Sequence, residues 1–207
     1  MVYLLTHPDE IAILVWQHLQ MTLSALAIAI LIAVPIALLI HQFRWLSVPV
    51  MGLLGIFYTI PSLALIIFLI PLFGLNATSV IVAMVIYTQV ILVRNLTVGL
   101  AGINHSVLEA ATGMGMNAWQ RWWWVQVPLV MPVFIAGVRI AAVVAIAIAT
   151  IGAKFNAGGL GQLLFNGIQT NRIDKIWAGS IAVAILALAV NGGLLWLEKR
   201  SQPVPQQ

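Results

Sequence analysis

Residues 109–128 form a polar, glycine-broken segment that is flanked on both sides by long apolar stretches. The segment reads E-A-A-T-G-M-G-M-N-A-W-Q-R-W-W-W-V-Q-V-P. Glu109 and the two alanines after it favour a helix, which Gly113 and Gly115 interrupt. We expect a helix, a sharp turn and a second short helix that presents the Glu109 carboxylate to a partner protein. A plain amphipathic connector fits the same residues equally well.

No enzymatic site is visible in the sequence. His7, His18, His41 and His105 are scattered, and there is no cysteine, which excludes disulfides and thiolate metal sites in this chain. The glycine-rich run A-G-G-L-G at 157–161 lacks the G-K-[ST] ending that places a lysine and a hydroxyl on a nucleotide, so it predicts a tight turn. We therefore expect a non-enzyme that holds no metal and no cofactor of its own.

The composition places the chain in a membrane. Of its 207 residues, 62% are hydrophobic and only 7% are charged. A spanning helix needs about 20 mainly apolar residues, and the sequence predicts an all-α integral membrane protein with about five transmembrane helices. The predicted domain covers residues 1–200 and is followed by a disordered tail, 201–207. Its spans lie at about 20–41, 48–73, 77–100, 129–152 and 176–197, and the polar segment falls in a loop at 102–128.

Prolines should interrupt or begin some of these helices. Pro61, inside the second span, should bend or break it near Phe57, because proline removes an intrahelical hydrogen bond. Pro71, Gly74 and Asn76 are expected to form the turn after that span. Pro128 is well placed to begin the fourth span.

The short loops predict an orientation, because positive residues are retained on the cytoplasmic side. Five spans put the two ends of the chain on opposite faces. A cytosolic C-terminus puts more arginine and lysine inside than the three outside, Lys154, Arg172 and Lys175. We therefore expect an outside N-terminus and a cytosolic loop 102–128. The net charge of +4 then reflects topology and gives no reason to invoke nucleic acid.

Arg139 is expected within the membrane thickness. The fourteen uncharged residues between it and Lys154 reach only about 21 Å as a helix, short of the roughly 30 Å hydrocarbon core. Such a charge either faces a bundle interior or water-filled path, or snorkels to the interface. On a path, Arg139 would pin a carbonyl, a helix end or a carboxylate. Every acidic residue is expected at a terminus or in a loop.

Polar or bent positions in apolar spans are the other candidates for a translocation path, although most such residues are interhelical hydrogen-bond partners. These candidates are Tyr58, Pro61, Gln89 and Asn191. The tryptophans Trp119 and Trp122–Trp124 have two open interpretations, a belt at the membrane interface or a hydrophobic face for a partner protein. The belt fits the run of three slightly better.

The polar segment resembles a family signature. E-A-A-x-x-x-G, then nine residues, then hydrophobic-x-hydrophobic-P, is similar to the EAA motif of permease subunits of ATP-binding-cassette (ABC) importers. The invariant positions of that motif correspond to Glu109, Ala110, Ala111, Gly115 and Pro128. Val125 and Val127 replace the more usual isoleucine and leucine. In that family the loop seats in a cleft of the ATPase subunit, which implies ATPase coupling for 109–115, Gly113 included, and for the segment around Trp119, Arg121 and Val125.

A wider stretch resembles one branch of that family. L-x-G before the motif, P-L-V-M-P-V-F-I-A-G-V-R after it and then A-G-G-L-G are similar to importers of quaternary-ammonium osmoprotectants such as glycine betaine, choline and carnitine. The resemblance implies a MetI-like type I permease fold in the bacterial inner membrane. It also implies cytosolic ATPases that hold ATP and Mg²⁺, a second permease copy or paralogue, and an extracytoplasmic binding protein.

The rival interpretation is a self-contained secondary transporter or channel subunit. Such a chain should offer paired intramembrane acids or inverted repeats. Neither feature is visible in this sequence.

Overall fold

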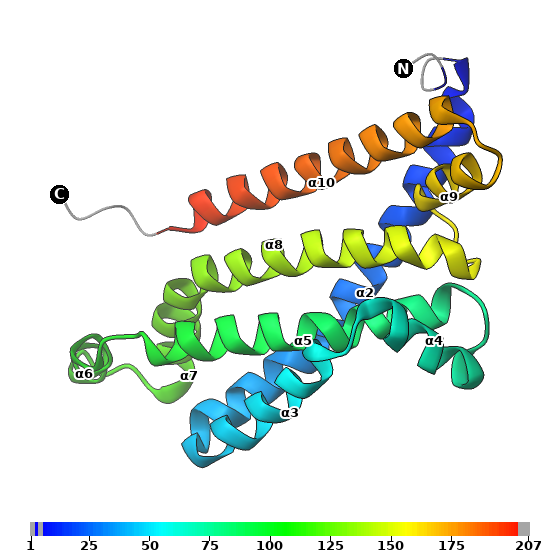
Figure 1. The fold of residues 1–207 in the computed structure, drawn as a ribbon. Coiled ribbons are helices and arrows are strands. Elements are labelled where there is room, and N and C mark those ends of the chain that lie inside the picture. The colour runs from blue at the N-terminus through cyan, green and yellow to red at the C-terminus, as the bar shows by residue number, and fades with distance from the viewer. Residues whose placement is uncertain (1–2, 4–5, 203–207) are drawn as a thin grey trace.

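The computed structural model describes residues 3 and 6–202, and its described part is helical, with no strand (Figure 1). The first half contains α2 (Pro8–Gln42), the 3-10 turn η1 (Arg44–Leu46), α3 (Ser47–Thr59), α4 (Ser62–Phe73) and α5 (Ala77–Ala101). The middle contains α6 (His105–Gly113), α7 (Ala118–Arg121) and the π-helical turn η2 (Trp122–Gln126). The remainder contains α8 (Val127–Gly152), the 3-10 turn η3 (Ala153–Phe155), α9 (Gly161–Gln169) and α10 (Ile173–Ser201).

Four described helices are long and apolar enough to cross a membrane, and a fifth span results if α3 and α4 count as one. These two helices meet at an angle of 95°. The break lies at Ile60 and Pro61, where Ile60 is extended with ψ 127°. Proline has no N–H to donate and pushes the preceding residue out of the helical region. The break expected near Phe57 is therefore present, a few residues later in the chain.

Pro71 is not part of the following turn, contrary to the expectation from sequence. It lies in the last turn of α4, and the helix ends at Phe73. Gly74, at φ +88°, makes the turn together with Asn76, whose side chain accepts from the N–H of Thr78 and caps α5. A glycine suits this backbone because it adopts positive φ at no steric cost.

Two spans are longer than hydropathy predicts. The first helix begins at Pro8, well before residue 20, with proline at its start and Asp9 and Glu10 in its first turn. These residue types stabilise a helix N-terminus. The last helix continues to Ser201, so the first residue of the predicted tail is helical. Residues 203–207 lie outside the described residues.

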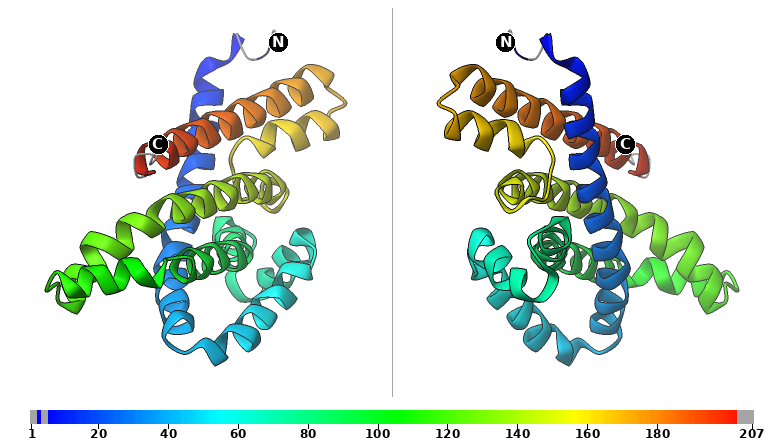
Figure 2. Two further views of the ribbon diagram at one scale, coloured as in Figure 1. Left: turned by 90° about the vertical axis from the view of Figure 1, so that its left-hand side faces the viewer. Right: turned by 90° about the vertical axis from the view of Figure 1, so that its right-hand side faces the viewer.

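The core forms where α2, α5 and α8 meet. α5 and α8 lie side by side, and α2 runs across both (Figures 1 and 2). Small side chains allow the close approach that helices need in a membrane. Gly137 of α8 is one such point, because a Cβ there would lie 2.7 Å from the Cβ of Asn95 on α5. The buried alanines of these three helices are Ala25, Ala29, Ala33, Ala37, Ala83, Ala141, Ala142, Ala145 and Ala149.

The run at 157–161 forms the predicted tight turn. Gly158 and Gly159 have φ of +87° and +79°. The Gly159 N–H donates to Oε1 of Gln17 at 3.0 Å. His18, also on α2, is fully buried, with Nε2 3.2 Å from the carbonyl oxygen of Ile146. α2 therefore holds both the end of α8 and the turn that follows it.

Candidate coupling site

The polar segment lies at one end of the molecule and begins with α6. Asn104 caps this helix, because its side chain accepts from the N–H of Ser106 at 3.0 Å. Ala111 is buried, whereas Glu109 and Ala110 are exposed. The Glu109 carboxylate lies 3.1 Å from Nδ1 of His105, one helical turn earlier, and both side chains are strongly exposed. An exposed pair of this kind stabilises the protein little, so Glu109 is free to contact a partner.

The turn after α6 is built by local hydrogen bonds. The N–H groups of Gly115 and Met116 donate to the carbonyl oxygens of Thr112 and Ala111 at 2.9 and 3.2 Å. Gly115 has φ +81°, a conformation that glycine adopts readily. The chain then enters α7 through a capping box between Asn117 and Gln120. The helix, sharp turn and second short helix expected from sequence are therefore present.

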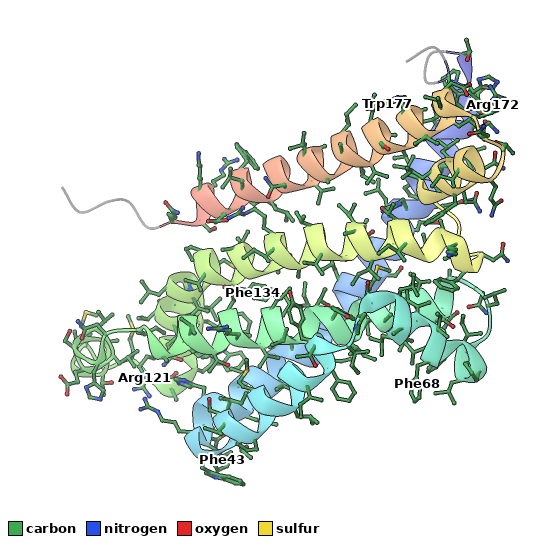
Figure 3. The ribbon with its side chains drawn as sticks, viewed as in Figure 1. Phe43, Phe68, Arg121, Phe134, Arg172 and Trp177 are labelled. Atoms are coloured by element: carbon green, nitrogen blue, oxygen red, sulfur yellow. The ribbon has the colours of Figure 1, made fainter. Side chains whose placement is uncertain are left out.

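One side-chain contact ties the two short helices together. Nη1 of Arg121 on α7 donates to Oγ1 of Thr112 on α6 at 2.8 Å. Figure 3 shows Arg121 at this end of the molecule, opposite the end that carries Arg172. Beside this contact lies an open hollow of about 470 Å³. It is lined by His105, Leu108, Glu109, Thr112, Gly113, Arg121 and Gln126.

The second short helix does not stop before the next span. Residues Ala118–Phe155 form one continuous helical stretch that includes α7, η2 and α8. The π-helical turn at Trp122–Gln126 directly precedes Pro128, which lies in the first turn of α8 and has no N–H to donate. Single π-helical turns inside helices are rare and often occur at functional sites. A force applied to α7 therefore acts directly on a membrane span.

The run of three tryptophans divides between the core and the surface. Trp122 packs against the core cluster, whereas Trp124 is 71% exposed. Trp119, 70% exposed, packs edge-on against Trp123 with ring centroids 5.5 Å apart. The exposed rings fit either a membrane-interface belt or a hydrophobic face for a partner, so both interpretations stay predictions.

The predicted coupling residues thus lie together at one end, in different environments. Those exposed to solvent are Glu109, Ala110, Gly113, Gly115, Trp119 and Pro128. Arg121 and Val125 are half-buried, and Ala111 is buried. Within the described residues, no group of three or more His, Cys, Asp or Glu side chains could hold a metal ion. The arrangement offers a candidate docking surface that carries a carboxylate, a guanidinium and three exposed indoles, those of Trp119, Trp123 and Trp124.

The predicted path residues do not form one group. Tyr58 and Pro61 lie at the break between α3 and α4, where the Tyr58 ring packs on Tyr87 with centroids 5.6 Å apart. Gln89 is buried on α5 and donates to the carbonyl oxygen of Ala29 on α2 at 3.1 Å. Arg139 and Asn191 do meet, with Nη1 of the arginine 3.3 Å from the amide oxygen.

One acidic residue near the C-terminus lies inside a helix that continues past the predicted end of its span. Glu198 lies within α10, and its Oε2 accepts from Nε of Arg139 on α8 at 2.9 Å. Hydropathy ends the last span at residue 197, which leaves Glu198 at the C-terminal end of the chain and outside the span. Helical periodicity could have found it, because Asn191 and Glu198 are two turns apart and lie on one face.

Comparison with known proteins gives a consistent result. Residues 25–203 match the family model described as "Binding-protein-dependent transport system inner membrane component". The carnitine transport permease protein OpuCB of Listeria monocytogenes is 39% identical over 188 residues, which are 91% of this chain and 86% of the relative. The osmoprotectant import permease protein OsmW of Salmonella typhimurium is 37% identical over 207 residues, covering 98% of this chain and 94% of the relative.

A solved structure shows the same fold. The MetNI methionine ABC transporter, in an inward-facing conformation, superposes with a TM-score of 0.80 at 21% identity and covers 94% of this chain and 97% of its own. The MetI-like all-helical fold implied by the resemblance is therefore confirmed.

Proposed function

This chain belongs to the family of inner-membrane components of binding-protein-dependent transport systems, and we propose that it carries quaternary-ammonium osmoprotectants. It is a multi-pass permease subunit of an ABC importer. The observation that supports this cargo assignment is the similarity, along almost the whole chain, to permeases for carnitine and for osmoprotectants. A further relative, from Bacillus subtilis, is a glycine betaine/carnitine/choline permease and is 32% identical over 203 residues.

The polar end formed by α6, α7 and η2 is the proposed docking site for the ATPase. Its exposed Glu109, its half-buried Arg121 and the hollow that both residues line suit a partner with complementary charge. We place this end in the cytosol, with the N-terminus outside and the C-terminus inside. ATP and Mg²⁺ would be held by the ATPase, and this chain would transmit the movement that follows nucleotide binding.

The remaining partners follow from the same proposal. A single chain with five spans, α3 and α4 counted as one, has little interior of its own, and much of its apolar surface is exposed. A second permease, either a copy or a paralogue, would complete the path. An extracytoplasmic binding protein would deliver the cargo to the opposite face. The rival interpretation as a self-contained transporter or channel is not favoured, because the relatives are permease subunits of importers.

An uptake experiment tests the proposed cargo. The complete transporter, reconstituted in liposomes with its ATPase and binding protein, would be offered radiolabelled glycine betaine, carnitine and choline. ATP-dependent accumulation of at least one is expected, and accumulation should stop without the binding protein. Transport of none of the three, by a complex that hydrolyses ATP when its binding protein is added, would contradict the cargo.

A further inference from the structure

An ion pair joins α8 to α10 away from the docking surface. Nε of Arg139 donates to Oε2 of Glu198 at 2.9 Å, and Nη1 lies 3.3 Å from Oδ1 of Asn191. The arginine and glutamate side chains are 26% and 16% exposed. The guanidinium is thus held by two groups of α10, the acidic one of which balances its charge. A membrane protein retains such charged groups chiefly where they face the bundle interior and have a function.

The two halves of α10 are held to the rest of the chain in different ways. Its four buried residues, Ala178, Gly179, Ala182 and Leu186, all lie in the first half. Among the described residues of the second half, none is buried. Asn191 and Glu198, which contact Arg139, belong to this second half. Apolar packing of this half on the core includes Val190 and Leu194, which are only half-buried, and the polar contacts to α8 add to it.

The partner of this half-helix is the span that continues from the docking surface. α8 is continuous with η2 and α7, and Arg121 of α7 is bonded to Thr112 of α6. A displacement of α6 or α7 is therefore transmitted to α8 through unbroken helix. Arg139 lies on α8, and its hydrogen bonds to Glu198 and Asn191 would make α10 move with α8.

We propose that Arg139 and Glu198, assisted by Asn191, form a latch that makes the second half of α10 follow α8 during the transport cycle. Both are positioning residues: they set how one helix follows another. The transport test of this proposal, cargo imported per ATP hydrolysed, rests on the proposed coupling function. The structural test, a distance between α5 and α10, does not. Opening the latch leaves the docking surface intact and releases the end of α10.

The transport test uses the complete complex in liposomes and measures cargo imported per ATP hydrolysed. Arg139→Gln and Glu198→Gln should each lower this ratio at least fivefold. The charge-reversed double variant, Arg139→Glu with Glu198→Arg, should recover to within about twofold of the wild type. Arg172→Gln is the matched control, because Arg172 pairs with Asp174 at the other end of α10. It should leave the ratio unchanged.

The structural test measures a distance and needs no cargo. The chain has no native cysteine, so spin labels can be placed at Val98→Cys on α5 and Leu197→Cys on α10, both exposed. Labelled copies, diluted with unlabelled ones in the assembled complex, should give one narrow distance distribution. Arg139→Gln should broaden it, and the charge-reversed double variant should narrow it again.

The two readouts separate the possible failures. If no osmoprotectant is transported, the distance test still decides the latch. An unchanged coupling ratio and an unchanged distance distribution in Arg139→Gln would overturn the proposal. A charge-reversed double variant that restored neither the coupling ratio nor the distance distribution would also overturn it. So would variants that weakened only the apparent affinity for cargo, because the pair would then contact cargo and not position a helix.

Discussion

Two glycine turns flank the long helical stretch Ala118–Phe155, and they are built in opposite ways. At the docking end, Gly115 has φ +81° and open space around it, and nearby N–H and C=O groups satisfy the turn. At the other end, Gly159 has φ +79°, but a Cβ there would lie 3.0 Å from Nδ1 of His18 and 3.1 Å from Cε of Met21. The first turn is locally complete and leaves its surface free, whereas the second depends on α2.

This contrast has a physical meaning. A surface that must accept a partner cannot be filled by its own chain, so its shape has to come from short-range hydrogen bonds and caps. A turn that fixes the end of a span can be stabilised by residues far away in the sequence. The hydrogen bond from the Gly159 N–H to Gln17 is an example. Substitutions at the two turns should therefore separate effects on docking from effects on stability.

The largest loss of stability is expected at Gly159. Gly159→Ala adds a left-handed backbone penalty of about 1–2 kcal/mol and an overpacking cost of about 1–3 kcal/mol against His18 and Met21. Thermal unfolding of the detergent-purified transporter should show a clear fall in Tm. An unchanged Tm would mean that the turn is not packed against α2 as described.

Gly115→Ala should be milder, because only the backbone penalty of about 1–2 kcal/mol applies in open space. The change should displace the start of α7 and weaken ATPase binding more than it lowers Tm. Gly115→Asn is the control, since asparagine tolerates the left-handed conformation better than alanine does. Equal effects of alanine and asparagine would argue against a role for backbone conformation here.

Gln17→Ala removes the acceptor of the Gly159 N–H. A lost hydrogen bond of this kind costs about 1 kcal/mol, and more when the donor stays unsatisfied. We expect a small fall in Tm and unchanged ATPase binding. Reduced ATPase binding with normal stability would contradict the separation between the two ends.

The smallest effect on stability is expected at Thr112. Thr112→Val removes the acceptor of the Arg121 hydrogen bond, which is exposed and should contribute less than about 1 kcal/mol. Tm should barely change, whereas coupling should weaken because α6 and α7 are no longer joined. Thr170→Val is a control, since Thr170 is also exposed and its hydroxyl donates to the backbone carbonyl of Asn166 on α9, the helix that Thr170 follows.

The sequence predicted those parts of the fold that local chemistry decides. Pro61 breaks its helix, Gly115 and the A-G-G-L-G run make turns, and apolar stretches form the spans. The misses arise where a helix continues past its apolar stretch. Hydropathy marks which residues prefer lipid but not where a helix ends, so it placed the start of α2 after Pro8 and the end of α10 before Glu198.

The candidate site was predictable to a similar extent. The spacing from Glu109 to Pro128 predicts the segment that forms the proposed docking surface, because that segment is local in sequence. The continuity of α7 with α8 was not predicted, since Pro128 suggested a new start and a π-helical turn has no clear sequence signal. The Arg139–Glu198 pair joins residues far apart in the chain, and only packing of α10 against α8 brings them together.

The most direct test of the central claim is ATPase association with a Glu109 variant. Glu109→Gln keeps the size of the side chain and removes its charge at an exposed position, so Tm should not change. Asp9→Asn, a change at another exposed acid near the opposite end of the molecule (Figure 1), is the matched control. We predict that co-purification of the ATPase and cargo uptake both fall at least tenfold for Glu109→Gln and stay at wild-type levels for Asp9→Asn. Wild-type association and uptake in Glu109→Gln would contradict the assignment of this end as the coupling site.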